Sequence, residues 1–265
     1  MRNLRRPEIL RGGLGCGHVL APGVLLFLAS LSSLAQTQQP KPEPPVADPK
    51  AVFQKAVEMY EAKKYSVALQ AFHEAAAGGN AEAAEYLGVM YSEGQGTSIR
   101  YDEAMTWFRK AAAHGDGQAM CNVGILYYRG LGVSQRYDAA LQWFRDAAFA
   151  GNSQAMFNIG AMYRDGVGQP IDLDLAMSWF LKSAASLNDK AMNSIGGLYR
   201  NGQGVAIDYA EAAKWYRRAA DLGNQAAMYN LGVLYEQGLG VPMDTVEAQK
   251  WFANASKNGQ EAAGQ

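Results

Sequence analysis

The chain repeats itself at a fixed interval of 36 residues, and this regularity constrains its fold more than any other feature. In every unit, position 8 is glycine, position 11 is tyrosine, and position 27 is a tryptophan that another aromatic residue follows; glycines recur at positions 14 and 16. The five units align without a gap and occupy residues 81–116, 117–152, 153–188, 189–224 and 225–260. One such unit cannot bury its aromatic side chains alone, so we expect the units to stack.

Each unit is predicted to form two helices. At 100° per residue, positions 3, 4, 7, 8, 10 and 11 share one side of the first helix and hold small, aliphatic and tyrosine side chains. Positions 24, 27, 28, 31 and 32 give the second helix a face of alanine and the aromatic pair. Glycine at position 8 lets a neighbouring helix approach, and the Gly-x-Gly turn supplies positive φ angles. The predicted fold class is all-α, a right-handed α-solenoid superhelix of stacked helix-turn-helix repeats.

Residues 50–80 are predicted to be a sixth, degenerate unit. Its matching residues are Tyr60, Ala68, Phe72 and Asn80. Five residues of the glycine loop are missing, and Ala71 stands in place of the tryptophan. These departures are typical of a terminal capping repeat. Residues 261–265 are expected to be a short tail.

The repeat resembles a known family. The segment 227–242, AMYNLGVLYEQGLGVP, followed by Ala248, Trp251 and Phe252, is similar to the Sel-one-like repeat, a branch of the tetratricopeptide superfamily with a longer turn. The resemblance covers residues 81–260 completely and 50–80 partially. It implies an α-solenoid that assembles or regulates other proteins. Exported bacterial members are often periplasmic regulators or secreted factors, and cysteine-rich members have been linked to β-lactam binding; this chain lacks those cysteines.

Residues 1–35 have the organisation of an export signal. An arginine-rich start precedes an apolar run from Val19 to Leu34, and the small residues Ser33 and Ala35 come just before Gln36. The run is short for a membrane span, which needs about 20 apolar residues. We expect a signal peptide that is cleaved near Ala35, with an uncleaved anchor as the alternative. The protein is then periplasmic or secreted.

Residues 36–49 are polar and rich in proline, so we expect an extended linker there. The body that follows is mildly acidic. The chain holds 24 basic and 25 acidic side chains, and without residues 1–35 it retains 20 basic and 24 acidic ones. This balance gives no electrostatic reason to bind a phosphate backbone, so nucleic acid is not an expected ligand. Membrane contact is expected only through an uncleaved signal.

No residue pattern indicates catalysis, a cofactor or a metal site. The Gly-x-Gly segments follow helices, whereas a nucleotide-binding loop follows a strand. His73 and His114 have no ligand partner at metal-binding spacing and are expected to be solvated. Acidic residues at position 20, namely Asp172, Asp208 and Asp244, precede the second helices and are expected to cap them.

Cys121 is the only cysteine that remains after residues 1–35, so an intramolecular disulfide is not possible in the mature chain. It occupies position 5, on the side of the first helix turned away from the core of its own repeat. Two interpretations stay open: a reactive or intermolecular thiol, and a partly shielded residue without a role.

The variable positions of the first helix are the predicted binding surface. Positions 2, 5, 6, 9, 12 and 13 share one side and are expected to face the concave surface. Apolar residues recur at position 9, asparagines at position 6 and arginines at position 12, which suits a peptide backbone and carboxylates. The candidate partner-binding residues are Tyr86, Asn122, Ile125, Tyr128, Phe157, Asn158, Arg164, Arg200, Tyr229 and Asn230. Alternatively, position 9 packs against the adjacent repeat and position 6 forms hydrogen bonds within the solenoid.

The third repeat departs from the others at Leu173, Leu181 and Leu187, which indicates either a second, convex contact patch or neutral drift. The leading functional prediction is an exported scaffold that binds a protein or peptide on its concave face. The competing predictions are a secreted hydrolase of β-lactams or cell wall, and a solenoid that self-assembles.

Overall fold

The computed structural model describes the backbone of residues 48–263 and the side chains of residues 48–256. The predicted signal peptide and all but the end of the predicted linker lie outside this part. Within residues 48–263 there are twelve α-helices and no strand, so the predicted all-α solenoid is confirmed. No described helix is both long and apolar enough to span a membrane.

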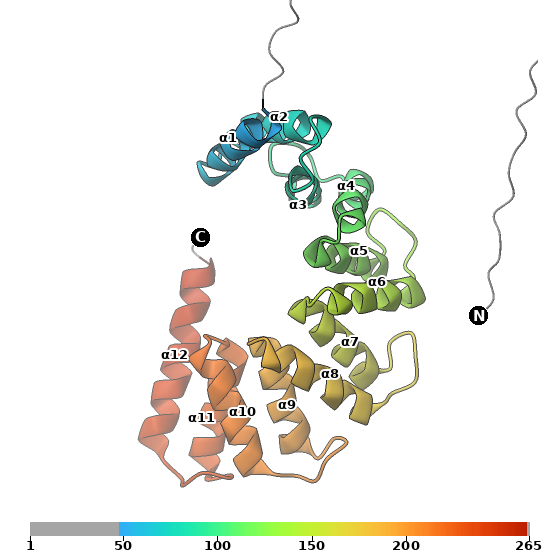
Figure 1. Cartoon of the computed structure of the whole chain (residues 1–265). Coiled ribbons are helices and arrows are strands. Elements are labelled where there is room, and N and C mark those ends of the chain that lie inside the picture. Colours follow the sequence, from blue (N-terminus) through green and yellow to red (C-terminus); the bar gives the residue numbers. More distant parts are fainter. Residues whose placement is uncertain (1–47, 264–265) are drawn as a thin grey trace, which may run out of the picture. The chain divides into compact units, whose positions relative to one another are not determined.

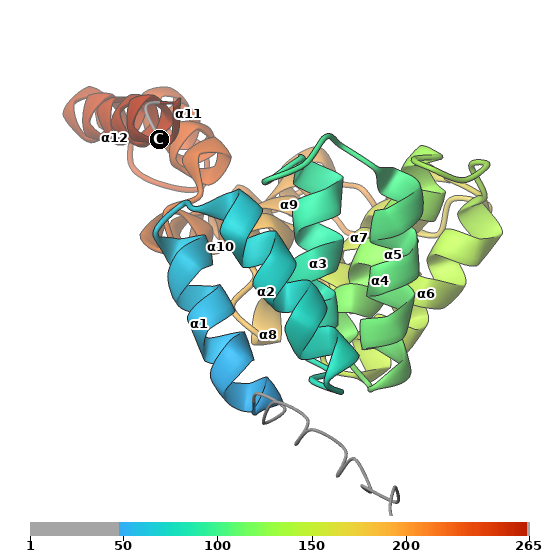
Figure 2. The same cartoon turned by 90° about the horizontal axis from the view of Figure 1, so that it is seen from above.

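The helices form antiparallel hairpins that stack in chain order (Figure 1). The first hairpin consists of α1 (Pro49–Glu61) and α2 (Tyr65–Ala77), joined by a short turn. One hairpin per 36-residue unit follows: α3 (Ala83–Glu93) and α4 (Tyr101–Ala113); α5 (Gly117–Arg129) and α6 (Tyr137–Phe149); α7 (Ser153–Asp165) and α8 (Leu173–Ala185); α9 (Asp189–Asn201) and α10 (Tyr209–Asp221); α11 (Gln225–Gln237) and α12 (Thr245–Ala263). The second helix of each hairpin packs on the first helix of the next (Figure 2). Helix α12 continues through residues 261–263, which were predicted to belong to a tail.

Side chains outside the helices define where most of them begin. The last residue of each of the first four units accepts a hydrogen bond from a backbone N–H of the following first helix, as Asn152 does from Ala155 at 2.8 Å. Asp172, Asp208 and Asp244 accept equivalent bonds at the start of α8, α10 and α12, which confirms their predicted capping role. Each first helix from α3 to α11 ends at a glycine in the left-handed region.

The aromatic ring at position 28 packs directly on the glycine at position 8 of the same repeat. A methyl group added at Gly160 would lie 2.7 Å from the ring of Phe180, and one at Gly124 would lie 2.6 Å from Phe144. Neither distance leaves room for a side chain. Phe144 and Phe180 are almost completely buried. The predicted close approach of the two helices in a repeat is therefore confirmed.

The glycine at position 16 has a second role that the turn alone does not explain. Besides its positive φ, it touches the start of the second helix in the preceding repeat. A methyl group at Gly132 would lie 2.7 Å from the backbone carbon of Tyr101, and one at Gly204 would lie 2.6 Å from Cβ of Leu173. The long loop thus also acts as a contact between repeats.

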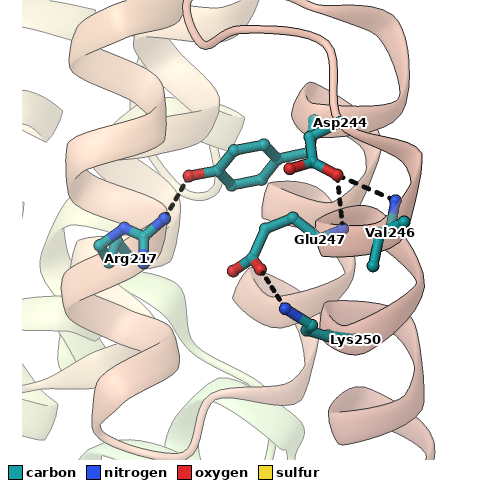
Figure 3. A network of polar contacts seen from close by, with 6 residues as sticks. Arg217, Asp244, Val246, Glu247 and Lys250 are labelled. Atoms are coloured by element: carbon teal, nitrogen blue, oxygen red, sulfur yellow. Dashed lines mark hydrogen bonds and ion pairs between the residues drawn. The ribbon is translucent and has the colours of Figure 1, made fainter.

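A polar contact links successive repeats at the edge of the core. The residue at position 29 donates a hydrogen bond to the tyrosine hydroxyl at position 11 of the next repeat, as Arg145 does to Tyr163 at 3.0 Å. Figure 3 shows the same contact from Arg217 to the hydroxyl of Tyr235, beside the capping Asp244 of α12. Leu181 occupies position 29 in the third repeat and cannot donate, so this bond is missing between the third and fourth repeats.

The three leucines that set the third repeat apart differ in exposure. Leu173 is half-buried against Gly204, whereas Leu181 and Leu187 are exposed. Leu187 adopts φ 59°, the left-handed conformation that its siblings reach with glycine.

Two adjacent glycines in α9 give a matched test of the ring seat. We expect Gly196→Ala to lower the free energy of unfolding by about 1–3 kcal/mol, because its methyl group would lie 2.7 Å from the Tyr216 ring. Gly197→Ala is the control, since its methyl group would be 3.9 Å from the Tyr216 hydroxyl. There the gain in helix propensity, about 1 kcal/mol, should stabilise the protein. Urea denaturation of both variants measures the difference, and equal effects would contradict the packing argument.

Candidate protein-binding groove

The surface formed by the first helices is hollowed along a continuous row. A hollow of about 560 Å³ lies between α1 and α3, one of about 430 Å³ between α3 and α5, and one of about 320 Å³ between α5 and α7. Glu85 lines the first two, and Ile125 and Arg129 line the last two. We call this row, from Phe53 on α1 to Lys190 on α9, the groove. Its lining comes mainly from the variable positions of the repeat.

Half of the predicted partner-binding residues line the groove. Tyr86 lies in the α1–α3 hollow, where its ring stacks on Phe72 at a centroid distance of 4.6 Å. The other four are Asn122, Ile125, Tyr128 and Asn158. The structure therefore brings together side chains from three consecutive repeats on one hollowed surface.

The remaining candidates are outside these hollows and contact the solenoid itself. Arg164 forms an ion pair with the adjacent Asp165 at 2.7 Å. Arg200 donates to the amide oxygen of Asn230, which in turn donates to Asn193 of the preceding repeat at 3.0 Å. Asn158, although it lines the groove, also donates to the sulfur of Cys121 at 3.8 Å. The alternative interpretation of position 6, hydrogen bonding within the solenoid, thus holds for these two asparagines.

Two aromatic candidates pack on the ring at position 28 of their own repeat. The ring of Phe157 lies 5.8 Å from that of Phe180, and Tyr229 lies 5.3 Å from Phe252. Tyr229 remains 58% exposed, so one side of its ring is free for a contact.

Several polar residues of the groove on the first helices α3 to α9 were not among the candidates, and four of them illustrate why. They are Glu85 and Gln154, on the first turns of α3 and α7, Arg129 at the end of α5, and Lys190 at the start of α9. They occupy positions 2, 5 and 13, which the helical periodicity had already assigned to the binding side. For Glu85, Arg129 and Lys190, the charge at these positions was the signal that could have identified them; Gln154 carries no such signal.

Glu85 is the titratable group that the groove perturbs. Burial raises the pKa of its carboxyl above the ordinary value, and the nearby Asp116 carboxylate raises it further. No described basic side chain lies within ion-pair distance of Glu85 to offset this. A cation arriving at the α1–α3 hollow would relieve an existing electrostatic cost.

Cys121 is completely buried between the second and third repeats, rather than partly shielded. Position 5 turns away from the core of its own repeat, as predicted, but it faces the next repeat instead of solvent. Burial raises the pKa of the Cys121 thiol to about 12. The interpretation as a reactive or intermolecular thiol is therefore wrong for the folded protein, because the nucleophilic thiolate is neither populated nor accessible.

We expect the Cys121 thiol to be inert until the protein unfolds. In a chain carrying Cys16→Ser, so that Cys121 is the only thiol, a chromogenic aromatic disulfide should react within minutes in denaturant and only at the unfolding rate in buffer. A further variant with Lys214→Cys, an exposed position on α10, is the positive control. Fast reaction of the native single-thiol protein would contradict the burial.

His73 was predicted to be a solvated surface residue, but it is half-buried and contacts the next repeat. Its Nε2 lies 2.9 Å from the Tyr91 hydroxyl, and its ring lies 5.2 Å from that of Trp107. It thereby occupies the place that arginine takes in the later repeat-to-repeat contacts. Burial lowers the His73 pKa below 6.5; Glu103 acts against this shift and Lys110 adds to it. His114 is exposed, as predicted.

The lowered His73 pKa predicts a pH-dependent stability. The folded state disfavours the imidazolium, so unfolding takes up a proton once the pH falls below about 6.5, the unfolded value. We expect the melting temperature to fall between pH 7 and 5.5, and to fall less in His73→Gln, which keeps a polar partner for Tyr91. Circular dichroism melts of both proteins measure this. Parallel curves would show that His73 does not carry the effect.

Among residues 48–256, no group of three or more His, Cys, Asp or Glu side chains is placed to hold a metal ion. The surface is instead one of hollows, aromatic rings and charges on preformed helices. Such a surface can hold a partner by complementarity of shape and charge.

The model of the Sel1 repeat matches this chain five times, at residues 81–116, 117–152, 153–186, 189–224 and 225–260. The chain belongs to the Sel1 repeat family. Proteins of this family are typically scaffolds for protein–protein interaction and are generally not enzymes. The resemblance inferred from the sequence is therefore confirmed for the five units, each of which contains one match, while the partial resemblance of residues 50–80 stays a prediction.

Solved Sel1 repeat structures have the same fold. A Sel1 repeat protein of Oxalobacter formigenes is 32% identical, with a TM-score of 0.74 over 78% of this chain and 84% of that one. The protective antigen c5321 of uropathogenic Escherichia coli is 30% identical, with a TM-score of 0.72 over 80% of this chain and 46% of its own. The immunity protein PA5088 of Pseudomonas aeruginosa, 17% identical over 81% of this chain and 82% of its own, shares the fold at a TM-score of 0.56. No curated protein matches the sequence.

Proposed function

We propose that this Sel1 repeat protein is an exported scaffold that holds a protein or peptide partner in the groove. The observation that carries the proposal is the continuity of the three hollows, which share lining residues from one repeat to the next. A continuous groove suits an elongated partner segment better than a small molecule. The glycines and aromatic residues that repeat without change are used in packing, so the variable lining is left for recognition.

The physical basis of binding is preorganisation. The groove side chains stand on helices whose positions the core fixes, so little conformational entropy is lost when the partner binds. Hydrogen-bonding groups such as Asn122 and Gln154 alternate with apolar ones such as Ile125 along the lining. Recognition in this form needs no covalent step.

We further propose that the protein acts after export, in the periplasm or outside the cell. The support is the sequence of residues 1–35, in which an arginine-rich start, an apolar run and small residues follow one another in the order of a signal peptide.

Site-specific photo-crosslinking in the native cell tests the groove. A photoreactive residue in place of Tyr128 or Arg129 should form adducts with a partner, whereas the same residue at Lys214 on α10 should not. Mass spectrometry of the adducts then identifies the partner. Adducts at both sites or only at Lys214 would reject the groove as the binding surface.

The identified partner permits a quantitative test. We expect Arg129→Glu to weaken its affinity about tenfold, because this exposed guanidinium lines two hollows and has no ion pair within the described side chains. Lys214→Glu makes the same charge change outside the groove and should leave the affinity unchanged. Circular dichroism melts should show that both variants remain folded, since both side chains are exposed.

A further inference from the structure

The two ends of the groove carry opposite charge. Over α1 and α3, the first hollow is lined by Glu58, Glu82 and Glu85 and by no basic side chain. Over α5 to α9, the last hollow is lined by Arg129 and Lys190 and by no acidic one. The middle hollow is lined by Glu85, Glu93 and Arg129 and so carries both signs of charge between the acidic end and the basic end. The groove is thus electrically polarised along its length.

The charges at the two ends of the groove are not neutralised by ion pairs within the described part of the protein. Exposed ion pairs form at the second helices, for example Arg100 with Glu103 and Lys214 with Glu211. None of the five groove charges at the two ends forms an ion pair with any described side chain. Charges that are left unpaired in a concave surface are available to a partner.

The apolar lining differs between the two ends in a way that fits the charges. Phe53 and Tyr86 form the floor of the acidic end, with ring centroids 5.7 Å apart. Aromatic faces in the same hollow as carboxylates suit a lysine or arginine side chain. Its alkyl stem can pack on the ring, and its positive charge can interact with the ring and with a carboxylate. At the other end Ile125, Tyr128 and Ala161 line the same hollow as Arg129 and Lys190, which suits a carboxylate flanked by apolar groups.

Resting on the proposed function, we propose that the occupant of the groove is an extended peptide segment with basic side chains at one end and carboxylates at the other. Its lysine or arginine residues lie over α1 and α3, and its aspartate, glutamate or terminal carboxylate lies over α5 to α9. A polyanion such as nucleic acid does not fit, since the acidic end repels it. A purely basic peptide does not fit, because Arg129 and Lys190 repel its other end.

Selection from a displayed library of random dodecapeptides on the full-length protein tests this order of charge. We expect the enriched peptides to carry basic residues in one half and acidic residues in the other. The double variant Glu58→Lys, Glu82→Lys turns the acidic end basic at two exposed positions. It should enrich peptides that are acidic in both halves. The matched control Glu74→Lys, Asp146→Lys changes the net charge equally on the exposed faces of α2 and α6 and should enrich the same peptides as the wild type.

Affinity measurements complete the test. A labelled peptide enriched on the wild type should bind the double variant about tenfold more weakly in fluorescence anisotropy, and this difference should shrink in 1 M salt. Two results would overturn the charge order alone: enriched peptides without opposite charges in their two halves, or enriched peptides that bind the wild type and the double variant with equal affinity. If a photoreactive residue at Lys214 captures the enriched peptides and one at the uncharged groove position Tyr128 does not, binding is outside the groove and the proposed function itself fails.

Discussion

An aromatic ring seated on a glycine is the contact on which the rest of this structure depends. In each repeat the ring at position 28 lies where the side chain of position 8 would otherwise be. The ring of the second helix therefore packs directly on the backbone of the first helix. Close packing of this kind leaves no space for an added methyl group. It fixes the hairpin as a rigid unit, and five such units with a related first hairpin build the solenoid. The groove is a consequence, since its lining stands on helices that this contact holds in place.

Contacts between repeats are more varied than those within them. The glycine at position 16 touches the previous repeat in every long loop, but the polar bond from position 29 is made by histidine once, by arginine elsewhere, and is missing at Leu181. Half-buried tryptophans form cation–π contacts with lysine or arginine side chains; for example, Nζ of Lys182 lies 4.3 Å from the centroid of the Trp179 ring. The junction between the third and fourth repeats therefore relies on packing without the polar tie.

The charges of the molecule are distributed according to their surroundings. At the second helices α4, α10 and α12, one pair of opposite charges three residues apart forms an exposed ion pair, and each such pair contributes little stability. In the groove, the unpaired carboxylates at one end lie over α1 and α3, and the unpaired cations at the other end lie over α5 to α9. Leaving Glu85 half-buried without a counter-charge costs stability.

The sequence by itself determined the repeat, the two helices in each unit, the capping residues and the seat of the ring, because all of these depend on residues less than one repeat apart. Only the tertiary structure decided which side chains of the first helix are free. Cys121 and Asn158 share the predicted binding side, yet they meet across the junction between repeats, while Arg129 and Lys190 remain open. The reason is geometric. Helical periodicity gives the direction of a side chain around its own helix, but the rotation from one hairpin to the next decides whether it meets a neighbour or solvent.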